Sequence, residues 1–212
     1  MSAQAQQRRG VIDRIIGLAV LAGGFAKFFA FFVSFAAYAL WFGSWRFGLG
    51  FVLLILVHEL GHVIEARRQR LPVTLPTFIP FLGAFVTVQQ ARIAPWRRAL
   101  VALAGPFVGG IGAAAVWAVG SAHDTVWLLV LANIGFLLNA FNLLPIGFLD
   151  GGQTARAARE EWRMPRIQFV GGVPVQAFAP DRARALVIVA LYVALAALLV
   201  LGMLATRPNG AL

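Results

Sequence analysis

Long apolar runs separated by shorter basic stretches set the pattern of this chain. The apolar runs cover residues 28–42, 47–66, 99–120, 126–144 and 183–205. An α-helix needs about 20 apolar residues to cross a bilayer, and most of these runs come close to that length. A further run at 11–24 carries Asp13 and Arg14, so it either lies at the membrane interface or forms part of the first span. The pattern predicts an all-α polytopic membrane protein with about five transmembrane helices.

The composition agrees with this prediction and narrows the possible chemistry. Of 212 residues, 60% are hydrophobic and 12% are charged, whereas a soluble domain carries about twice that charged fraction. There is no cysteine, so disulfide bonds and thiolate metal sites are excluded, and any metal must bind to His, Asp or Glu. The net charge of +10 does not indicate a nucleic-acid partner, because the basic residues of a membrane protein mainly report its orientation.

The basic residues gather at the N-terminus and in the two long segments between apolar runs. By the positive-inside rule, the side of the membrane that holds most Lys and Arg is the cytoplasmic side. We therefore expect a multi-pass protein of the cell (inner) membrane, with the N-terminus and the two long loops in the cytoplasm. The residues that set this orientation are Arg8, Arg9, Arg14, Arg67, Arg68, Arg70, Arg92, Arg97, Arg98, Arg156, Arg159, Arg163, Arg166, Arg182 and Arg184.

Three ionisable residues interrupt the second apolar run, in the pentapeptide HELGH. His58 and His62 are four residues apart, so on a helix they lie on the same face, one turn apart. Two imidazoles at that spacing can bind one zinc ion, and Glu59 beside the first is placed to act on a metal-bound water. A charge near the bilayer centre costs about 2.5–3.5 kcal/mol on insertion scales, so a purely structural role explains Glu59 poorly. The motif predicts a zinc site.

Two histidines leave a catalytic zinc site one protein ligand short of the usual three. His123, the third histidine, lies in a turn on the outer side of the membrane, and we expect it to be a solvated loop residue. Asp150 ends the run FNLLPIGFLDGG, where the fourth span returns to the cytoplasmic side. An Asp-Gly-Gly sequence alone is as typical of a turn as of a ligand. Beside HELGH it favours Asp150 as the third ligand.

The two motifs together resemble those of the site-2 protease family of intramembrane zinc metalloproteases. The resemblance covers residues 28–152, with HELGH, Ala104-Gly105-Pro106, FIPFLGAF at 78–85 and Leu149-Asp150-Gly151 as matching elements. It implies one zinc ion per chain, held by His58, His62 and Asp150, and cleavage of a membrane-protein substrate within its transmembrane segment. Many members carry a PDZ or CBS domain, for which this sequence has no room, so it resembles a short bacterial-type member.

The resemblance also implies how the chain is organised. We expect a single integral membrane protease domain over 1–212, with a three-helix catalytic core inside residues 28–152. A cytoplasmic loop at 153–182 and a C-terminal transmembrane helix at 183–205 would complete it. This last part of the chain matches no motif of the family.

The expected reaction is metal-assisted hydrolysis of a peptide bond. Glu59 would take a proton from the attacking water and return it to the leaving amine. Asn142, eight residues before Asp150, matches the asparagine of the family motif. It either donates a hydrogen bond to the oxyanion or makes an interhelical hydrogen bond. Asn139, one turn earlier, is interpreted as a residue of the interhelical kind.

A transmembrane substrate must unwind locally, because its helix hides the peptide bonds behind its own hydrogen bonds. Pro76, Pro80 and Gly83 break helix, and residues 85–89 have strand character. The hypothesis is a short membrane-associated β-like segment near 78–90 that pairs with the unwound substrate, with Gly83 and Phe85 as substrate-binding residues. A loop resting on the membrane surface is the alternative.

Small residues repeat along the third apolar run. Gly105, Gly109 and Ala113 follow one another at four-residue spacing, which gives a helix a flat ridge that a neighbour can approach closely. We interpret this ridge as a packing surface without a catalytic role.

Two other classes of function remain open. Intramembrane His and Glu also mark ion paths, so a zinc or proton-coupled transporter is an alternative, although the five runs show no inverted repeat. A catalytically inactive membrane scaffold is the other alternative, against which the intact set of His58, Glu59, His62 and Asp150 argues.

Overall fold

The fold is described by a computed structural model. It describes residue 26 and residues 29–74, 77–79, 83–85, 93–163, 166–170 and 173–207. The predicted run at 11–24 and the end of the predicted β-like segment, 86–90, lie outside the described residues. The chain divides into two compact units. The first comprises Met1–Val52 and Thr77–Phe85, and the second comprises Leu53–Pro76 and Val86–Leu212.

The described part of the first unit holds two helical segments and a short β-hairpin. The helix Phe29–Trp41 leads through a turn into the beginning of α2 (Trp45–Arg68). The two segments pack closely because Gly48 has no side chain: a Cβ there would lie less than 3.0 Å from the backbone of Ala39. The hairpin consists of the antiparallel strands β1 (Thr77–Ile79) and β2 (Gly83–Phe85).

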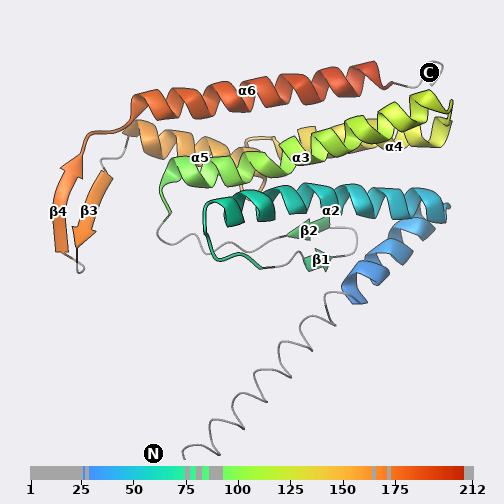
Figure 1. The fold of residues 1–212 in the computed structure, drawn as a ribbon, viewed down its shortest axis with the longest axis horizontal. Helices are drawn as coiled ribbons and strands as arrows, with labels where there is room; N and C mark the ends of the chain where they lie inside the picture. The colour runs from blue at the N-terminus through green and yellow to red at the C-terminus, as the bar shows by residue number, and fades with distance from the viewer. Residues whose placement is uncertain are drawn as a thin grey trace, which may run out of the picture. The chain divides into compact units, whose positions relative to one another are not determined.

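In the second unit, four helices pack with the remainder of α2. They are α3 (Pro95–Ala122), α4 (Val126–Asn142), α5 (Asp150–Arg163) and α6 (Arg182–Ala205). Both α3 and α6 run alongside α4 and α5 (Figure 1). Apolar side chains of α3, α4, α6 and the segment after α4 form a buried core: Leu103, Ala113, Phe136, Leu143, Leu195 and Leu199.

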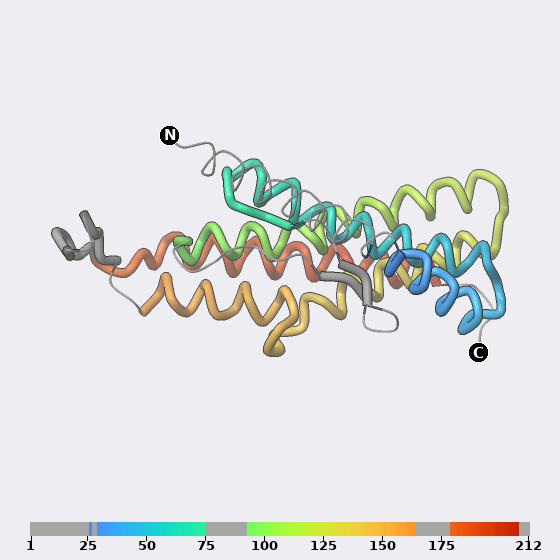
Figure 2. Tube along the Cα trace, turned by 90° about the horizontal axis from the view of Figure 1, so that it is seen from below, coloured from blue at the N-terminus to red at the C-terminus, as the bar shows by residue number. Residues whose placement is uncertain are grey.

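Helices α4 and α5 follow one another along one path, interrupted by an irregular segment at 143–149 (Figure 2). Asp150, the first residue of α5, follows this segment directly. The region predicted as a loop at 153–182 therefore contains all but the first three residues of α5. It also contains the antiparallel strands β3 (Arg166–Val170) and β4 (Val173–Phe178). Helix α5 was not recognised because it is polar, and its buried stripe includes Thr154, Ala157 and Glu161 rather than large apolar residues.

The last turns of α5 are tied to the first turn of α3. The backbone N–H of Trp96 donates to Oε1 of the buried Glu161 over 3.1 Å. Arg98, one turn into α3, forms an ion pair with Glu160. These contacts satisfy a backbone donor that a helix N-terminus otherwise leaves free, and they fix the far end of the helix that begins with Asp150.

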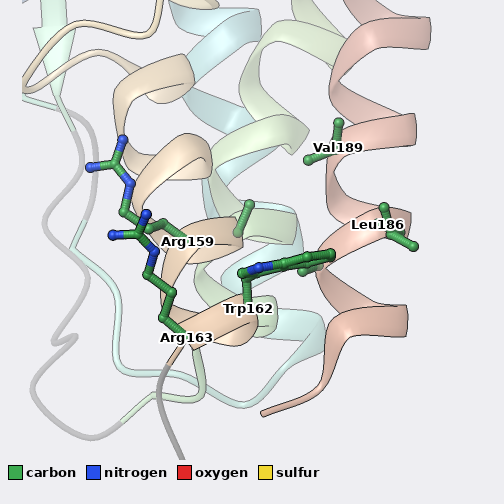
Figure 3. Close-up of a pocket in the computed structure, with 7 residues that line it drawn as sticks. Arg159, Trp162, Arg163, Leu186 and Val189 are labelled. Carbon is green, nitrogen blue, oxygen red and sulfur yellow. The ribbon is translucent and has the colours of Figure 1, made fainter.

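A groove of about 300 Å³ lies between α5 and α6. The indole of Trp162 extends from α5 toward Leu186 and Val189 of α6, whereas the guanidinium groups of Arg159 and Arg163 point away from α6 (Figure 3). Trp162 thus fills part of the space between α5 and α6. Helix α5 packs against both α6 and α3.

Three helices, α2, α3 and α6, are long and apolar enough to cross a membrane. The helix Phe29–Trp41 and α4 are also apolar but shorter. The prediction of a helical multi-pass membrane protein is confirmed by these three candidate spans. The part of the chain that the structure describes contains six helices. The number of five spans stays a prediction.

Candidate metal centre

The HELGH motif lies in the second half of α2, where α3 approaches closely. The rings of His58 and His62 share one face of the helix, with centroids 4.9 Å apart. Gly61, between them, faces α3: a Cβ there would lie less than 3.0 Å from the carbonyl group of Ala104. Glycine at this position therefore allows α2 to pack closely against the backbone of α3, and the ring of His62 lies against that backbone at Gly105.

Asp150 meets both histidines from the start of α5. Its Oδ2 atom lies 3.3 Å from His58 Nε2 and 3.4 Å from His62 Nε2, and the two Nε2 atoms are 3.2 Å apart. A tetrahedral zinc ion with bonds of about 2.0–2.1 Å holds its ligand atoms about 3.3–3.4 Å from one another. The three atoms therefore have the mutual spacing of three ligands to one ion. Among the described residues, they form the cluster of ionisable side chains able to hold a metal.

Both imidazoles make a hydrogen bond through the nitrogen that faces away from Asp150. His62 Nδ1 lies 2.8 Å from the carbonyl oxygen of Val101, and His58 Nδ1 lies 2.8 Å from Asn139 Oδ1. Because both partners are oxygen acceptors, each Nδ1 carries the proton and donates, and each Nε2 keeps its lone pair. This is the protonation state in which a neutral imidazole binds a metal through Nε2.

The carboxylate completes a set of electron-pair donors. Asp150 is buried, and its Oδ2 has no hydrogen-bond donor in the part of the chain that the structure describes. Two imidazole lone pairs and a carboxylate oxygen thus converge on one region that is shielded from water. A divalent cation stabilises such an arrangement, and a donor set of two nitrogens and one oxygen fits zinc.

The small-residue ridge of α3 provides space for these side chains. A Cβ on Gly105 would lie less than 3.0 Å from the ring of His62, and a Cβ on Gly109 would lie equally close to the amide group of Asn139. Further along, Ala113 packs against Gly135 of α4. The sequence predicted the ridge as a packing surface, and the structure adds that two of its members border the site.

The two glycines after Asp150 allow α5 to begin against the segment at 143–149. A Cβ on Gly151 would lie less than 3.0 Å from the carbonyl group of Leu143, and one on Gly152 would do the same at Ile146. The hydroxyl of Tyr192 in α6 donates to that same Leu143 carbonyl. The backbone around Asp150 is therefore held from α6 as well as by its own turn.

The other residues predicted for the site have different surroundings. Glu59 is buried next to His58 in α2, and its role as general base stays a prediction. Asn142 is half-buried, and its amide donates to the Leu138 carbonyl of its own helix over 3.0 Å, so an oxyanion contact stays a prediction. His123 is exposed in the turn after α3, as expected. Gly83 and Phe85 belong to β2, and their contact with a substrate stays a prediction.

Sequence reasoning missed two partners of the histidines. Asn139 does make an interhelical bond, as interpreted, but its partner is His58, so it belongs to the site. Its signal was present, because a polar side chain in an otherwise apolar helix needs a hydrogen-bond partner when it is buried. The Val101 carbonyl has no sequence signal, since any residue would provide it.

The sequence of this chain is similar to the sequences of known proteins. A family model described as "Peptidase family M50" matches residues 46–127 and 121–172. The chain is 32% identical over 159 residues to the putative zinc metalloprotease Rip3 of Mycobacterium tuberculosis, which covers 69% of this chain and 39% of that protein. It is 30% identical over 156 residues to the probable zinc metalloprotease EGY1, chloroplastic, of Arabidopsis thaliana, which covers 51% of this chain and 28% of that protein.

The chain spans less than half the length of these curated relatives. The family match nevertheless covers more than half of the chain and includes HELGH as well as the Leu-Asp-Gly motif. On this match and on the geometry of His58, His62 and Asp150, the chain belongs to peptidase family M50, the site-2 protease family that its two motifs predicted.

Proposed function

We propose that this chain is an intramembrane zinc endopeptidase that hydrolyses a peptide bond within the transmembrane segment of a membrane-protein substrate. The observation that carries the proposal is the convergence of His58 Nε2, His62 Nε2 and Asp150 Oδ2 at mutual distances of 3.2–3.4 Å. These three side chains would hold one zinc ion per chain. Bound zinc supplies Lewis acidity, which makes water more acidic and polarises the scissile carbonyl group.

Glu59 is the proposed general base and acid. It takes a proton from the attacking water and holds it while the carbonyl carbon becomes tetrahedral. It then delivers the proton to the nitrogen of the leaving amine. Its burial beside His58 supports this role, because electrostatic interactions between charges are stronger where water is excluded.

Asn142 is the proposed donor to the oxyanion. An amide N–H aimed at the developing negative charge stabilises the transition state more than the substrate. In the structure this amide donates to the Leu138 carbonyl, so the proposed role requires the Asn142 side chain to turn away from its own helix when substrate is present.

The β1–β2 hairpin is the proposed substrate-binding segment. Its two strands pair with each other through Thr77 opposite Phe85 and Ile79 opposite Gly83, and an unwound substrate would add as a further strand beside β2. Exchanging Gly83 and Phe85 for polar residues should slow cleavage of a membrane-embedded reporter while zinc content stays at the wild-type level. Unchanged cleavage by a folded variant would show that the hairpin does not bind the substrate.

The proposed topology has five spans, a catalytic core inside 28–152 and the basic segments on the cytoplasmic side. His58 is eight residues, or about 12 Å at the helical rise, from the cytoplasmic end of its apolar run. The cut should therefore fall in the cytoplasmic half of the transmembrane segment of the substrate. Mass spectrometry of the product termini tests this, and a cut in the outer half would overturn the topology.

One experiment separates the protease from its two alternatives. Wild-type protein and Glu59→Gln are purified, their bound zinc is measured, and each is incubated with a membrane-embedded reporter. The protease predicts about one zinc per chain in both proteins and cleavage by the wild type alone. Zinc without cleavage by the wild type would favour a scaffold, and zinc flux across a vesicle membrane without cleavage would favour a transporter.

A further inference from the structure

Asn139 of α4 is fully buried, with 0% of its surface exposed, and both ends of its amide group are hydrogen-bonded. Its Nδ2 donates to the Gly135 carbonyl over 2.7 Å, and its Oδ1 lies 2.8 Å from His58 Nδ1. A carbonyl can only accept, so the NH₂ end of the amide must face Gly135 and the oxygen must face His58. The orientation of the amide follows from its partners.

This orientation determines the state of His58. An amide oxygen only accepts, so it holds the imidazole proton on Nδ1 and leaves the lone pair of His58 on Nε2. That nitrogen is the one that lies 3.3 Å from Asp150 Oδ2 and 3.2 Å from His62 Nε2. The bond also limits rotation of the ring about its side-chain axis. Asn139 therefore controls both the tautomer and the direction of one proposed zinc ligand.

The surroundings of Asn139 are adapted to this contact. A Cβ on Gly109 of α3 would lie less than 3.0 Å from the Oδ1, Cγ and Nδ2 atoms of Asn139, so a larger residue at 109 would displace the amide. The acceptor is also neutral. A carboxylate in its place would bring a further charge into an apolar helix, which is unfavourable inside a bilayer.

We infer that Asn139 is a positioning residue of the metal centre, which keeps His58 in the ligating tautomer and orientation. The inference rests on the proposed zinc site and deepens it. The alternative is a purely structural role, in which the Asn139 amide only connects two helices and does not affect zinc binding. Asn133, also on α4, is such an amide: it is half-buried and donates to the Met203 carbonyl and to Thr206 Oγ1. It provides the matched control.

The test measures the zinc dissociation constant by competition with a chelator and, separately, the thermal unfolding of each protein in detergent. Asn139→Leu, of similar volume but without an acceptor, should weaken zinc binding about 10–100-fold, as removal of a hydrogen-bond partner from a ligating histidine typically does. Asn139→Asp keeps an oxygen beside His58 Nδ1 and should bind zinc more tightly than Asn139→Leu, although its added charge should lower the unfolding temperature. Asn133→Leu should lower the unfolding temperature and leave zinc affinity unchanged.

Two results would overturn the inference. One is a folded Asn139→Leu protein with wild-type zinc affinity, and the other is an equal loss of affinity in Asn133→Leu. If wild-type protein binds no zinc at all, the proposed function itself fails, which distinguishes that failure from this one.

A second measurement needs no variant of Asn139. Nitrogen-15 NMR of the zinc-free wild-type protein reports the histidine tautomers, with the signals assigned by replacing His62 and His123 in turn. The inference predicts His58 with its proton on Nδ1, and a predominant Nε2–H form would contradict it. If Asn139→Leu does not fold, this measurement decides.

Discussion

Gly105 of α3 lies directly against the imidazole ring of His62. A Cβ at position 105 would lie less than 3.0 Å from the Nε2, Cε1 and Cδ2 atoms of that ring. The same ring donates from Nδ1 to the carbonyl oxygen of Val101, one turn earlier on α3. Helix α3 thus helps to place the proposed ligand His62 in two ways. The Val101 carbonyl accepts a hydrogen bond from the ring, and the lack of a side chain at Gly105 leaves room for it.

Gly105→Ala should therefore displace His62 and weaken zinc binding, at least about 10-fold, in a protein that still folds. Chelator competition measures the affinity. Gly110→Ala, on the same helix, is the matched control, because the Cβ there would meet the end of the flexible Leu199 side chain, which can move. Equal zinc affinity in both variants would show that Gly105 only serves packing.

Gly151 and Gly152 should be sensitive to the addition of a single methyl group. Alanine at either position would place its Cβ against a backbone carbonyl of the segment at 143–149, and backbone cannot move aside as a side-chain end can. We expect a loss of about 1–3 kcal/mol in the free energy of unfolding together with weaker zinc binding, because Asp150 begins the same turn. Thermal unfolding in detergent and zinc analysis measure the two effects. Variants with wild-type values of both would contradict this account of the Asp-Gly-Gly motif.

Tyr192→Phe tests whether α6 supports the site. The change removes the hydroxyl that donates to the Leu143 carbonyl and should cost about 0.5–1.5 kcal/mol of stability. If the segment before Asp150 is held through this bond, reporter cleavage should fall further than a loss of stability alone explains. The comparison is with a variant of similar stability loss away from the site, such as Asn133→Leu. Cleavage rates that are equal in the two variants would show that α6 stabilises the fold without positioning Asp150.

The proposed ligands were predictable from sequence because their chemistry is local. The spacing of His58 and His62 follows from the period of a helix, and a motif of ionisable residues within an apolar run is conspicuous. Asp150 needed one further step, the expectation that a later span returns to the same side of the membrane. The structure brings these three residues together as expected.

The supporting residues were not predictable in the same way, since their roles depend on contacts between helices. A sequence does not show that Gly109 faces Asn139, or that Asn139 faces His58. Helix α5 was missed because polar positions dominate it and its buried stripe includes an ionisable residue, Glu161, in place of a large apolar one. An expectation based on apolar runs therefore assigns such a segment to a loop.

Zinc content of four alanine variants tests the central claim most directly. His58→Ala, His62→Ala and Asp150→Ala each leave two protein ligands, which do not hold zinc tightly. His123→Ala changes an exposed histidine outside the cluster and serves as the control. Elemental analysis after removal of loosely bound metal should find about one zinc per chain in the wild type and His123→Ala, and almost none in the other three. Full zinc in a folded Asp150→Ala protein would contradict the assignment of Asp150 as a ligand.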